Sequence, residues 1–598
     1  MDYKLTKISD NRIANCTDQL DMAVFSSGSD ITKQAFTAIS ATNSNWTFNI
    51  PIGSQSLILD RAITNQADVY FTLYITGIAN GNSCLSSLGT MDSLGQFPLN
   101  SLFQTSSCTI NSSSSSIQSR DIVPQILRMC DQNKLAKSNQ GTPAYVDKYY
   151  YNYIDGNGAS NNALGDLTVG GYQEQVFGRG AFPITIDLIQ RWAYADRANY
   201  PAGAPTDNSP VCTDAGARDQ FLVKCHTTLI EPLIGLAPWL FEDSDKNSMG
   251  IYGVQTCTFN MTIDQSLNRF WSSAVLAPKV LTITLGQATT GGVAGANGGN
   301  GFANVQMNMT FLSPQPSDAI HLPLKNIVPY TNYSQVLTAQ QGANLAPAVA
   351  SDTGALVLTS RTITSNTITL SVIPDQIWVC CRVPMANKTI NSTNSYFVIQ
   401  KVVAQFANKS GIFSNLNSFD LNTLANKNGL QQGASFLEWN GVAMKGAVQV
   451  PTSGSFFCFS PIDMGLDDMH TCGSSGQYTF SIQVTVANQS LVALPYELAI
   501  CTVESGLFIT QEAQSMIQIG VLSSQDVLSA KENKEVIPSD NYQEQTGGAS
   551  SARMRTAVKH FRKHHHNNGA RHQEEQGSGM SAGNLSAGRR HGLHKYIR

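Results

Sequence analysis

Apolar and polar side chains alternate with a period of two in many short runs of this chain. One run covers residues 69–75 (VYFTLYI), and similar runs cover 305–311, 368–372 and 478–486. Successive side chains of a strand point to opposite faces, so each run predicts a half-buried antiparallel strand. Pro374 follows the third run and is expected to end it, because proline cannot donate to a strand ladder.

Helical patterns are scarce by comparison. One candidate covers residues 122–137, where Asp121 is placed to cap the helix and Pro124 falls in its first turn. Clusters of Gly, Asn, Ser and Pro separate the remaining apolar runs. Many short strands joined by polar connections predict β-sandwiches of Greek-key or jelly-roll type.

The chain of 598 residues is too long for one hydrophobic core, and two large sandwiches fit its length. Residues 141–217 and 286–301 form long Gly- and Asn-rich connections, which are usually functional or mobile. The first is the candidate for outer surface, with an inserted β-subdomain as the alternative. Residues 314–329 contain four prolines and predict a linker between two halves.

Composition points to a surface of uncharged polar residues. Apolar residues make up 42% of the chain and charged residues only 13%. Such surfaces suit proteins that pack among copies of themselves, because facing patches of like charge repel. The first residues show no signal peptide, and no apolar run is long enough to span a membrane. The cysteines are therefore expected to be reduced and mostly buried.

Motifs that carry catalysis or bind cofactors are absent from the sequence, which predicts neither an enzyme nor a cofactor. Cys212 with Cys225 and His226 has a metal-like composition but lacks a fourth ligand at usable spacing, so a buried thiol and a hydrogen-bonded imidazole are preferred. A second acidic group, at residues 463–472, is interpreted as turn residues. Asn260 and Asn308 lie in sequons, but both are expected to fill the polar face of strands.

Charge is distributed unevenly along the chain. Residues 551–598 contain ten Lys and Arg against two Glu, which gives this segment a charge of +8. Because the whole chain has a net charge of −4, residues 1–550 carry a charge of −12. Seven of the ten histidines, including His564–His566, lie in the same tail. A mildly acidic body and a basic, His-rich tail are expected to do different work.

Part of this tail has the pattern of a basic amphipathic helix. Its apolar positions recur at helical spacing and its cations surround them; the residues concerned are Met554, Arg555, Val558, Lys559, Phe561, Arg562 and Lys563. A helix of this kind binds nucleic acid, a membrane surface or an acidic protein groove, and the sequence does not choose among them. A solvated tail without a specific partner is the alternative.

Several blocks occur in a fixed order between residues 45 and 528. They are FPLNSLFQTSSCTIN, VIPDQIWVCCRVP, NSYFVIQKVVAQFANKSGIFSNLN, LEWNG and ELAICTVESGLFITQEAQSMIQIGVLSSQDVL. This order resembles the double jelly-roll major capsid proteins of the polinton, virophage and adenovirus lineage of DNA viruses. The resemblance implies an all-β fold of two consecutive jelly-roll sandwiches with long loops and a basic C-terminal tail.

The resemblance divides the chain into four parts. Residues 1–44 form an N-terminal arm, 45–325 the first jelly roll with a surface loop at about 141–217, 326–530 the second jelly roll, and 531–598 a flexible tail. Three chains are expected to form a pseudo-hexagonal capsomer that tiles an icosahedral shell. The implied partners are further copies, neighbouring capsomers, and penton and minor capsid proteins, within a virion made in the host cytoplasm or nucleus.

Two near-identical tetrapeptides in the tail, ending at Gly583 and Gly588, look like sites cut by adenovirus-type maturation proteases. Small residues after an apolar one in a flexible segment give such a protease an extended backbone to bind. Residues 546–549 (TGGA) are a weaker candidate. The tail is therefore expected to contact a viral protease, with simple Gly/Ser-rich filler as the alternative.

Other function classes remain open from sequence. A carbohydrate-binding adhesin or spike is the main alternative, because residues 145–158 (YVDKYYYNYIDGNG) offer aromatic rings for sugars. A glycoside hydrolase would need two carboxylates that flank a cleft, and no convincing pair is found. Trp239, Phe241 and Trp439 either anchor contacts between subunits or plug the ends of their own sandwiches.

Overall fold

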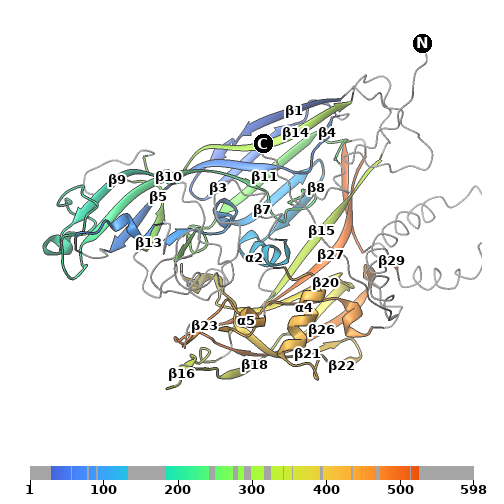
Figure 1. Cartoon of the computed structure of the whole chain (residues 1–598). Helices are drawn as coiled ribbons and strands as arrows, with labels where there is room; N and C mark the ends of the chain where they lie inside the picture. Colours follow the sequence, from blue (N-terminus) through green and yellow to red (C-terminus); the bar gives the residue numbers. More distant parts are fainter. Residues whose placement is uncertain are drawn as a thin grey trace, which may run out of the picture. The chain divides into compact units, whose positions relative to one another are not determined.

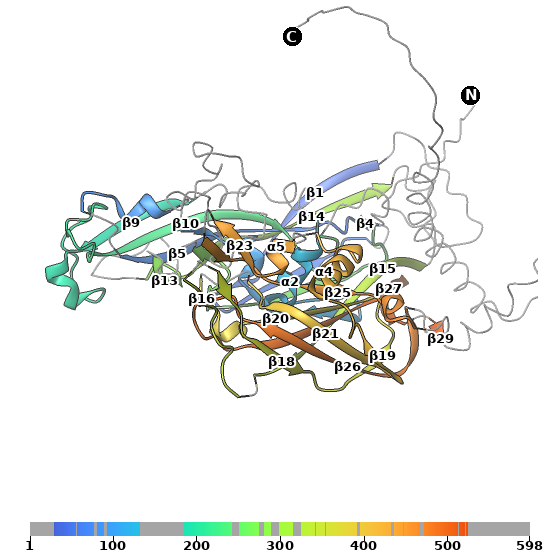
Figure 2. The same cartoon turned by 60° about the horizontal axis from the view of Figure 1, so that its bottom comes forward.

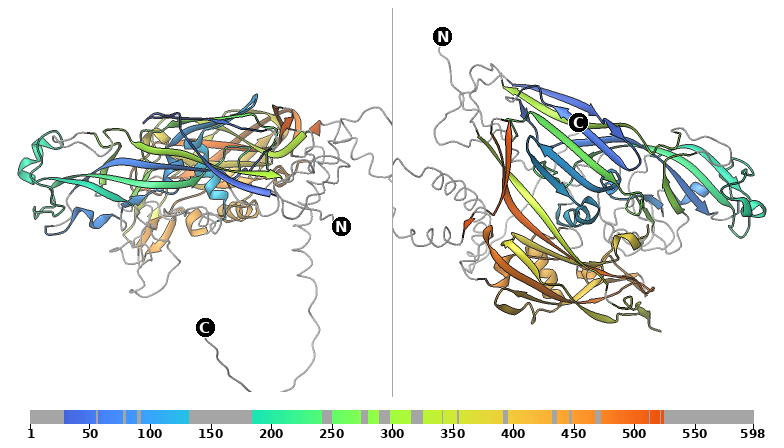
Figure 3. Two further views of the ribbon diagram at one scale, coloured as in Figure 1. Left: turned by 90° about the horizontal axis from the view of Figure 1, so that it is seen from above. Right: turned by 180° about the vertical axis from the view of Figure 1, so that it is seen from behind.

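The computed structural model describes residues 29–523, apart from 55–56, 77–79, 89–91, 132–183, 242–249, 274–279, 289–297, 315–324, 341, 353–354, 391–394, 432–435, 446–447, 467–471, 512 and 521. The chain separates into one unit, Met1–Ala530, and a second, Lys531–Arg598. All described residues belong to the first unit. Strands dominate it, and they form two groups, blue to green and yellow to orange (Figure 1, Figure 3).

The first sandwich consists of two antiparallel sheets. The larger has the order β1-β14-β5-β10-β9, with β13 and β4 paired to β5 and β14. Its strands are β1 (Ser29–Thr37), β4 (Ile58–Leu59), β5 (Thr64–Thr76), β9 (Thr185–Trp192), β10 (Gln220–Pro232), β13 (Val280–Leu285) and β14 (Phe302–Pro314). The smaller has the order β2-β3-β11-β7-β8, from β2 (Ser40–Ala41), β3 (Asn45–Pro51), β7 (Phe103–Ile110), β8 (Ser113–Ile117) and β11 (Thr256–Ile263). A short pair joins β6 (Asp92–Leu94) to β12 (Trp271–Ser273).

The second sandwich repeats this arrangement. One sheet has the order β15-β27-β20-β25, with β28 added to β27, from β15 (Lys325–Thr338), β20 (Gln376–Arg382), β25 (Phe457–Phe459), β27 (Glu497–Gln511) and β28 (Gln514–Ile519). The other has the order β18-β26-β21-β22, with β19 and β29 added to β26, from β18 (Ser360–Thr364), β19 (Ile368–Val372), β21 (Val398–Phe406), β22 (Lys409–Ile412), β26 (Ser474–Ala487) and β29 (Leu522–Ser523). Two hairpins complete it, β16 (Val349–Ala350) with β17 (Leu356–Val357) and β23 (Val442–Lys445) with β24 (Val448–Pro451).

Short helices lie between the strands. The α-helices are α1 (Pro98–Ser101), α2 (Ser119–Met129), α4 (Ser418–Lys427) and α5 (Phe436–Trp439), and the 3₁₀ turns are η1 (Cys84–Ser87), η2 (Tyr194–Asn199), η4 (Met385–Asn387) and η5 (Pro461–Met464). Figure 2 shows α4 and α5 close together on the second sandwich. None of the described helices has the length and hydropathy to cross a membrane.

The predicted strands are confirmed by burial that follows their alternation. In β5 the side chains of Val69, Phe71, Leu73 and Ile75 have no exposed surface. In β19, buried and exposed residues alternate along the whole strand, as the pattern at 368–372 predicts. The runs at 305–311 and 478–486 lie inside β14 and β26. The all-β architecture of two sandwiches is therefore the predicted one.

The predicted helix at 122–137 is real but begins earlier. Helix α2 begins at Ser119, so Asp121 lies inside its first turn and Pro124 lies in its interior. Gln118 occupies the N-cap and makes no side-chain cap bond. The prediction that Asp121 caps the helix is wrong, because its carboxylate is engaged by an arginine of the second sandwich. Helix α2 ends at Met129, and residues 132–137 lie outside the described residues.

Two predicted connections contain strands. Within 141–217, residues Thr185–Trp192 form β9 and pair with β10, so this part belongs to a sheet. The predicted linker at 314–329 ends inside β15, which begins at Lys325. Pro329 is tolerated there because β15 pairs only with β27 and is an edge strand among those described.

The cysteines behave as small buried hydrophobes. Each of the eleven described cysteines is a free thiol, and all are buried except the half-buried Cys472. The Sγ atoms of Cys108 and Cys257 lie 3.6 Å apart and are not bonded to each other. Burial raises the pKa of Cys84 and Cys458 to about 12, so both thiols stay protonated at neutral pH.

Candidate functional site at the junction of the two sandwiches

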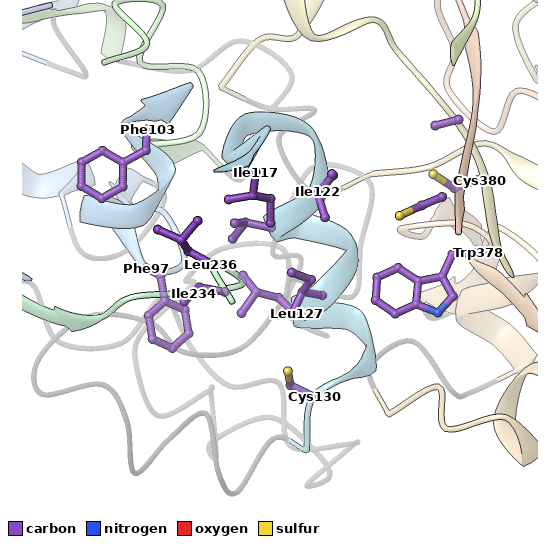
Figure 4. Packing of buried hydrophobic residues seen from close by; sticks show 14 of the residues in the cluster. Phe97, Phe103, Ile117, Ile122, Leu127, Cys130, Ile234, Leu236, Trp378 and Cys380 are labelled. Carbon is purple, nitrogen blue, oxygen red and sulfur yellow. The ribbon is translucent and has the colours of Figure 1, made fainter. Parts of the chain in front are cut away.

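Helix α2 of the first sandwich packs against the second sandwich as well as its own. Nine of its residues, from Ser119 to Arg128, are buried. Figure 4 shows Ile122 and Leu127 on this helix, with Trp378 and Cys380 of β20 beyond it. The helix therefore lies between the core of its own sandwich and the outward face of β20.

Arg382 of β20 forms the most deeply buried ion pairs at this junction. Its side chain has no exposed surface. Its Nη2 donates to Asp121 Oδ1 at 2.8 Å and its Nη1 donates to the Asp121 carbonyl at 3.0 Å. Its Nε donates to Glu497 Oε1 of β27 at 2.7 Å. One guanidinium thus links α2 of the first sandwich to two strands of the second.

Further buried cations lie near the ion pairs of Arg382. The Arg128 guanidinium lies 5.2 Å from the centre of the Tyr396 ring, and the Lys388 Nζ lies 5.8 Å from the same ring. Both contacts are within the range of cation–π attraction. Arg269 Nη1 donates to the Arg120 carbonyl at 3.2 Å. The junction therefore concentrates positive charge in a buried region.

Burial lowers the pKa of two of these cations. The pKa of Lys388 falls to about 7, first because of burial and then because of the nearby Arg382 and Arg269 guanidinium groups. The pKa of Arg269 falls to about 10, mainly through burial. Arg269 stays charged at neutral pH, whereas Lys388 is close to half protonated.

Backbone carbonyls accept further hydrogen bonds across the junction. Arg61 of the first sandwich donates through Nη2 to the Pro329 carbonyl of β15 at 2.9 Å. Thr510 Oγ1 of β27 donates to the Tyr252 carbonyl at 2.6 Å, and Asn326 Nδ2 donates to the Gly250 carbonyl at 3.2 Å. These bonds are directional, so they fix one arrangement of the sandwiches.

The residues singled out for metal chemistry have structural roles. Cys225 is buried in β10, and His226 Nδ1 lies 2.8 Å from Asp187 Oδ1. Asp463 accepts hydrogen bonds from the backbone and side chain of Ser460 and from Asn428, within the turn η5. The described residues contain no cluster of three or more His, Cys, Asp or Glu that could hold a metal ion. Cys225 and His226 thus have the buried and hydrogen-bonded surroundings predicted for them, whereas residues 467–471 of the second group lie outside the described residues.

The aromatic residues proposed as subunit anchors pack within the chain. Trp239 is almost fully buried, and its indole lies against Phe259 and donates to Cys108 Sγ at 3.3 Å. Phe241 contacts Phe97, and Trp439 has no exposed surface. Trp239 and Trp439 therefore close their own sandwiches, whereas Phe241 is half-buried and its role between subunits stays a prediction.

A shallow surface hollow offers no catalytic chemistry. It is lined by Ala41, Thr42, Asn43, Ser44, Gln265, Gly299 and Asn300. None of these side chains is ionisable, so the hollow provides no general acid or base to activate the Thr42 or Ser44 hydroxyl.

An apolar surface that the sequence interpretation missed lies on the second sandwich. Phe419 of α4 and Leu437 of α5 are 58% and 50% exposed, and Phe419 contacts Phe436 with ring centres 5.3 Å apart. We call Phe419, Phe436 and Leu437 the α4–α5 ridge. Asn417 and Asp420 form a capping box at the start of α4, and this signal would have revealed the helix.

The proposed tail residues, 554–563 with Gly583 and Gly588, lie outside the described residues, as do His564–His566 and the aromatic stretch 145–158. Their predictions therefore stay predictions.

Comparison with known families identifies two consecutive matches. A family model described as the first domain of the Sputnik virophage major capsid protein matches residues 1–312. A second, described as the C-terminal domain of major capsid protein V20, matches residues 333–506. Together they cover most of both sandwiches.

Individual relatives agree with these matches. A capsid protein V20 of Sputnik virophage is 24% identical over 525 residues, which cover 85% of this chain and 78% of that protein. The Sputnik virophage structure at 3.5 Å has a chain with a TM-score of 0.65 and 20% identity, covering 90% of this chain and 97% of its own. The mavirus major capsid protein has a TM-score of 0.60 and 15% identity, covering 88% and 98%. These structures share the double jelly-roll fold with this chain.

Replacing Arg382 by methionine should strongly destabilise the chain. The change leaves the Asp121 and Glu497 carboxylates buried without their cation, which typically costs about 3–5 kcal/mol. Urea unfolding followed by tryptophan fluorescence measures the loss. Arg218→Met is the matched control, because Arg218 pairs with Asp214 at an exposed site. An equal, small loss in both variants would show that the junction does not depend on Arg382.

Replacing Lys388 by methionine should change how stability depends on pH. The unfolded lysine has a pKa near 10.5 and the folded one about 7. Between these values the unfolded chain binds more protons, so the free energy of unfolding rises with pH. In the variant, the free energy of unfolding should no longer rise with pH in this range. The stability that the variant gains over the native chain should be largest below pH 7 and vanish near pH 10.5. Unfolding at pH 6, 8 and 10 tests this, with exposed Lys401→Met as control; an advantage independent of pH would contradict it.

Proposed function

The chain belongs to the major capsid protein family of the Sputnik virophage, and from this premise we propose that three copies form a pseudo-hexagonal capsomer that tiles an icosahedral shell. Its relatives are capsid proteins, so the expectation of a structural rather than catalytic protein is confirmed. As a capsid protein, the chain is a component of the virion. The assembly into trimers and shells is the proposal.

One observation supports the trimer most directly: each chain contains two sandwiches with the same strand order. The order β1-β14-β5-β10 in the first corresponds to β15-β27-β20-β25 in the second. Three such chains around a threefold axis present six similar walls, and a six-walled unit tiles a hexagonal lattice. The junction at Arg382 supports this by fixing both walls of each chain.

We propose that the two jelly rolls comprise residues 45–325 and 326–530, after an arm at 1–44. The strand pairing supports this division, because no described strand of residues 29–314 pairs with one of residues 325–523. In the virion the capsomer would contact neighbouring capsomers and also penton and minor capsid proteins.

The tail at 531–598 is proposed to act during assembly. The basic amphipathic pattern at 554–563 suits contact with nucleic acid, a membrane or a protease inside the particle. Cleavage after Gly583 or Gly588 would then remove the end of the tail.

Native mass spectrometry of the purified full-length chain tests the trimer. The expected species is three chains of 64.5 kDa each, and electron microscopy should show particles with a hexagonal outline. A chain that stays monomeric across the accessible concentration range would refute the proposed capsomer.

Intact-mass measurement of the chain from mature particles tests the cleavage. The expected chain ends at Gly583 or Gly588, and replacing each glycine by valine should block cutting at that site, because a bulky side chain does not fit a slot for small residues. A full-length mass from native particles would contradict the cleavage and leave the trimer untouched.

A further inference from the structure

The two sandwiches share a helix as well as their sheets. In the first, the hairpin β7–β8 is followed by α2, and β7 pairs with β11. In the second, the hairpin β21–β22 is followed by α4, and β21 pairs with β26. Helix α4 is therefore the counterpart of α2.

The two helices also begin alike. Helix α2 starts with Ser119-Arg120-Asp121-Ile122 and α4 with Ser418-Phe419-Asp420-Leu421. In α2, Ile122, Val123 and Ile126 are buried. The aligned residues of α4, Leu421, Asn422 and Ala425, are buried as well. Both helices thus use the same face to cover their own sandwich.

Their opposite faces differ. Helix α2 is covered a second time by β20, and its Asp121 carboxylate receives Arg382. Helix α4 leaves Phe419 58% exposed, and no basic side chain within the described residues pairs with Asp420, whose carboxylate accepts only the Asn417 backbone N–H of its own cap. The face that α2 buries within the chain is left open on α4.

The counterpart of the β20 surface lies on the first sandwich. Trp378, Cys380 and Arg382 are the outward residues of β20, and β20 corresponds to β5 in the strand order. The outward residues of β5 include Asp68 and Tyr70, since Val69 and Phe71 point into the core. Thr228 and His226 of the neighbouring β10 lie opposite them.

This surface is already ordered. Asp68 accepts Thr228 Oγ1 at 2.5 Å and Asn304 Nδ2 at 2.6 Å. The Tyr70 ring stacks on the His226 ring with centres 5.2 Å apart. A surface held in one conformation loses little entropy when a partner binds. We call Asp68, Tyr70, His226 and Thr228 the β5–β10 face.

We propose that the α4–α5 ridge of one copy packs on the β5–β10 face of a second copy, and so repeats between chains the contact that α2 makes with β20 within one chain. This inference rests on the proposed trimer and specifies its contact surfaces. Phe419 stands where α2 has Arg120, so the contact between chains is the more apolar of the two. Burial of Phe419 and Leu437 supplies its driving force.

The geometry also favours a ring. The ridge belongs to the second sandwich and the face to the first, so each copy offers two different surfaces. Such head-to-tail contacts generate closed rings when the rotation closes, whereas a twofold dimer needs one self-complementary surface. In a ring of three copies, the contact within each chain and the contact between chains follow each other. First and second sandwiches then alternate around the axis.

Photo-crosslinking of the full-length assembly tests the contact. Benzoylphenylalanine replaces Phe419, and light and heavy-isotope chains are mixed so that links between copies are distinguished by mass. Links from position 419 to peptides of β5 or β10 in another copy are expected. The control places the same probe at Val349, which is 59% exposed on β16, and should not give these links. Links from position 419 only to its own chain or to other elements would overturn the proposal.

Weakened variants provide an independent measurement. Phe419→Ser with Leu437→Ser, and separately Tyr70→Ala, should each weaken the trimer about 10-fold or more, as loss of central interface anchors does. The exposed positions of Phe419 and Leu437 should leave the unfolding of the monomer nearly unchanged. A mixture of the two variants should form dimers, because one intact ridge still meets one intact face.

The two levels of proposal fail differently. The native chain could form a stable trimer that the ridge substitutions do not weaken and that crosslinks through other elements. This result would contradict the proposed contact surfaces but not the proposed capsomer. A native chain that never trimerises would overturn both.

Discussion

A fully buried guanidinium needs hydrogen-bond acceptors around it, and Arg382 finds three of them where the two sandwiches meet. Its donors reach a helix of the first sandwich and a strand of the second. A shift of either sandwich would leave a buried carboxylate without its cation, which is far more costly than losing apolar contact area. The junction therefore selects one relative placement of the two sandwiches.

The strands were accessible from sequence because their determinants are local. Alternation at 368–372 predicts β19 residue by residue, since neighbours in the chain alone decide which face a side chain takes. The start of α2 was not accessible. Asp121 has the local signature of a cap, but its partner Arg382 is 261 residues away. The same limit applies to β9, which is recognisable only from its pairing with β10.

Helix α4 was missed for a different reason. Its capping box is visible in the sequence, but the helix is only ten residues long and directly follows the block of residues 394–417, in which strand and turn patterns dominate. Trp239 and Trp439 were ambiguous because an aromatic residue in a loop is equally suited to a core and to an interface, and only burial separates the two. The candidate site itself, a set of cations from both halves, has no sequence motif, since it is assembled by tertiary packing.

The two sandwiches have the same strand order, but their equivalent helices α2 and α4 have different surroundings. The same structural element is therefore used in two different environments. The fold places α2 where both sides are covered within the chain and α4 where one side faces outward. The surface chemistry follows this difference: the buried setting uses an ion pair and backbone carbonyls, and the open setting uses aromatic and aliphatic side chains.

The state of the thiols has a consequence for durability. Eleven described cysteines contribute to the packing, yet no pair of them is bonded. Burial raises the pKa of Cys84 and Cys458 and keeps both thiols from water, so these two present almost no thiolate to oxidants. The described residues thus contain no disulfide that a reducing cell interior could break, so this part of the fold does not depend on an oxidising environment.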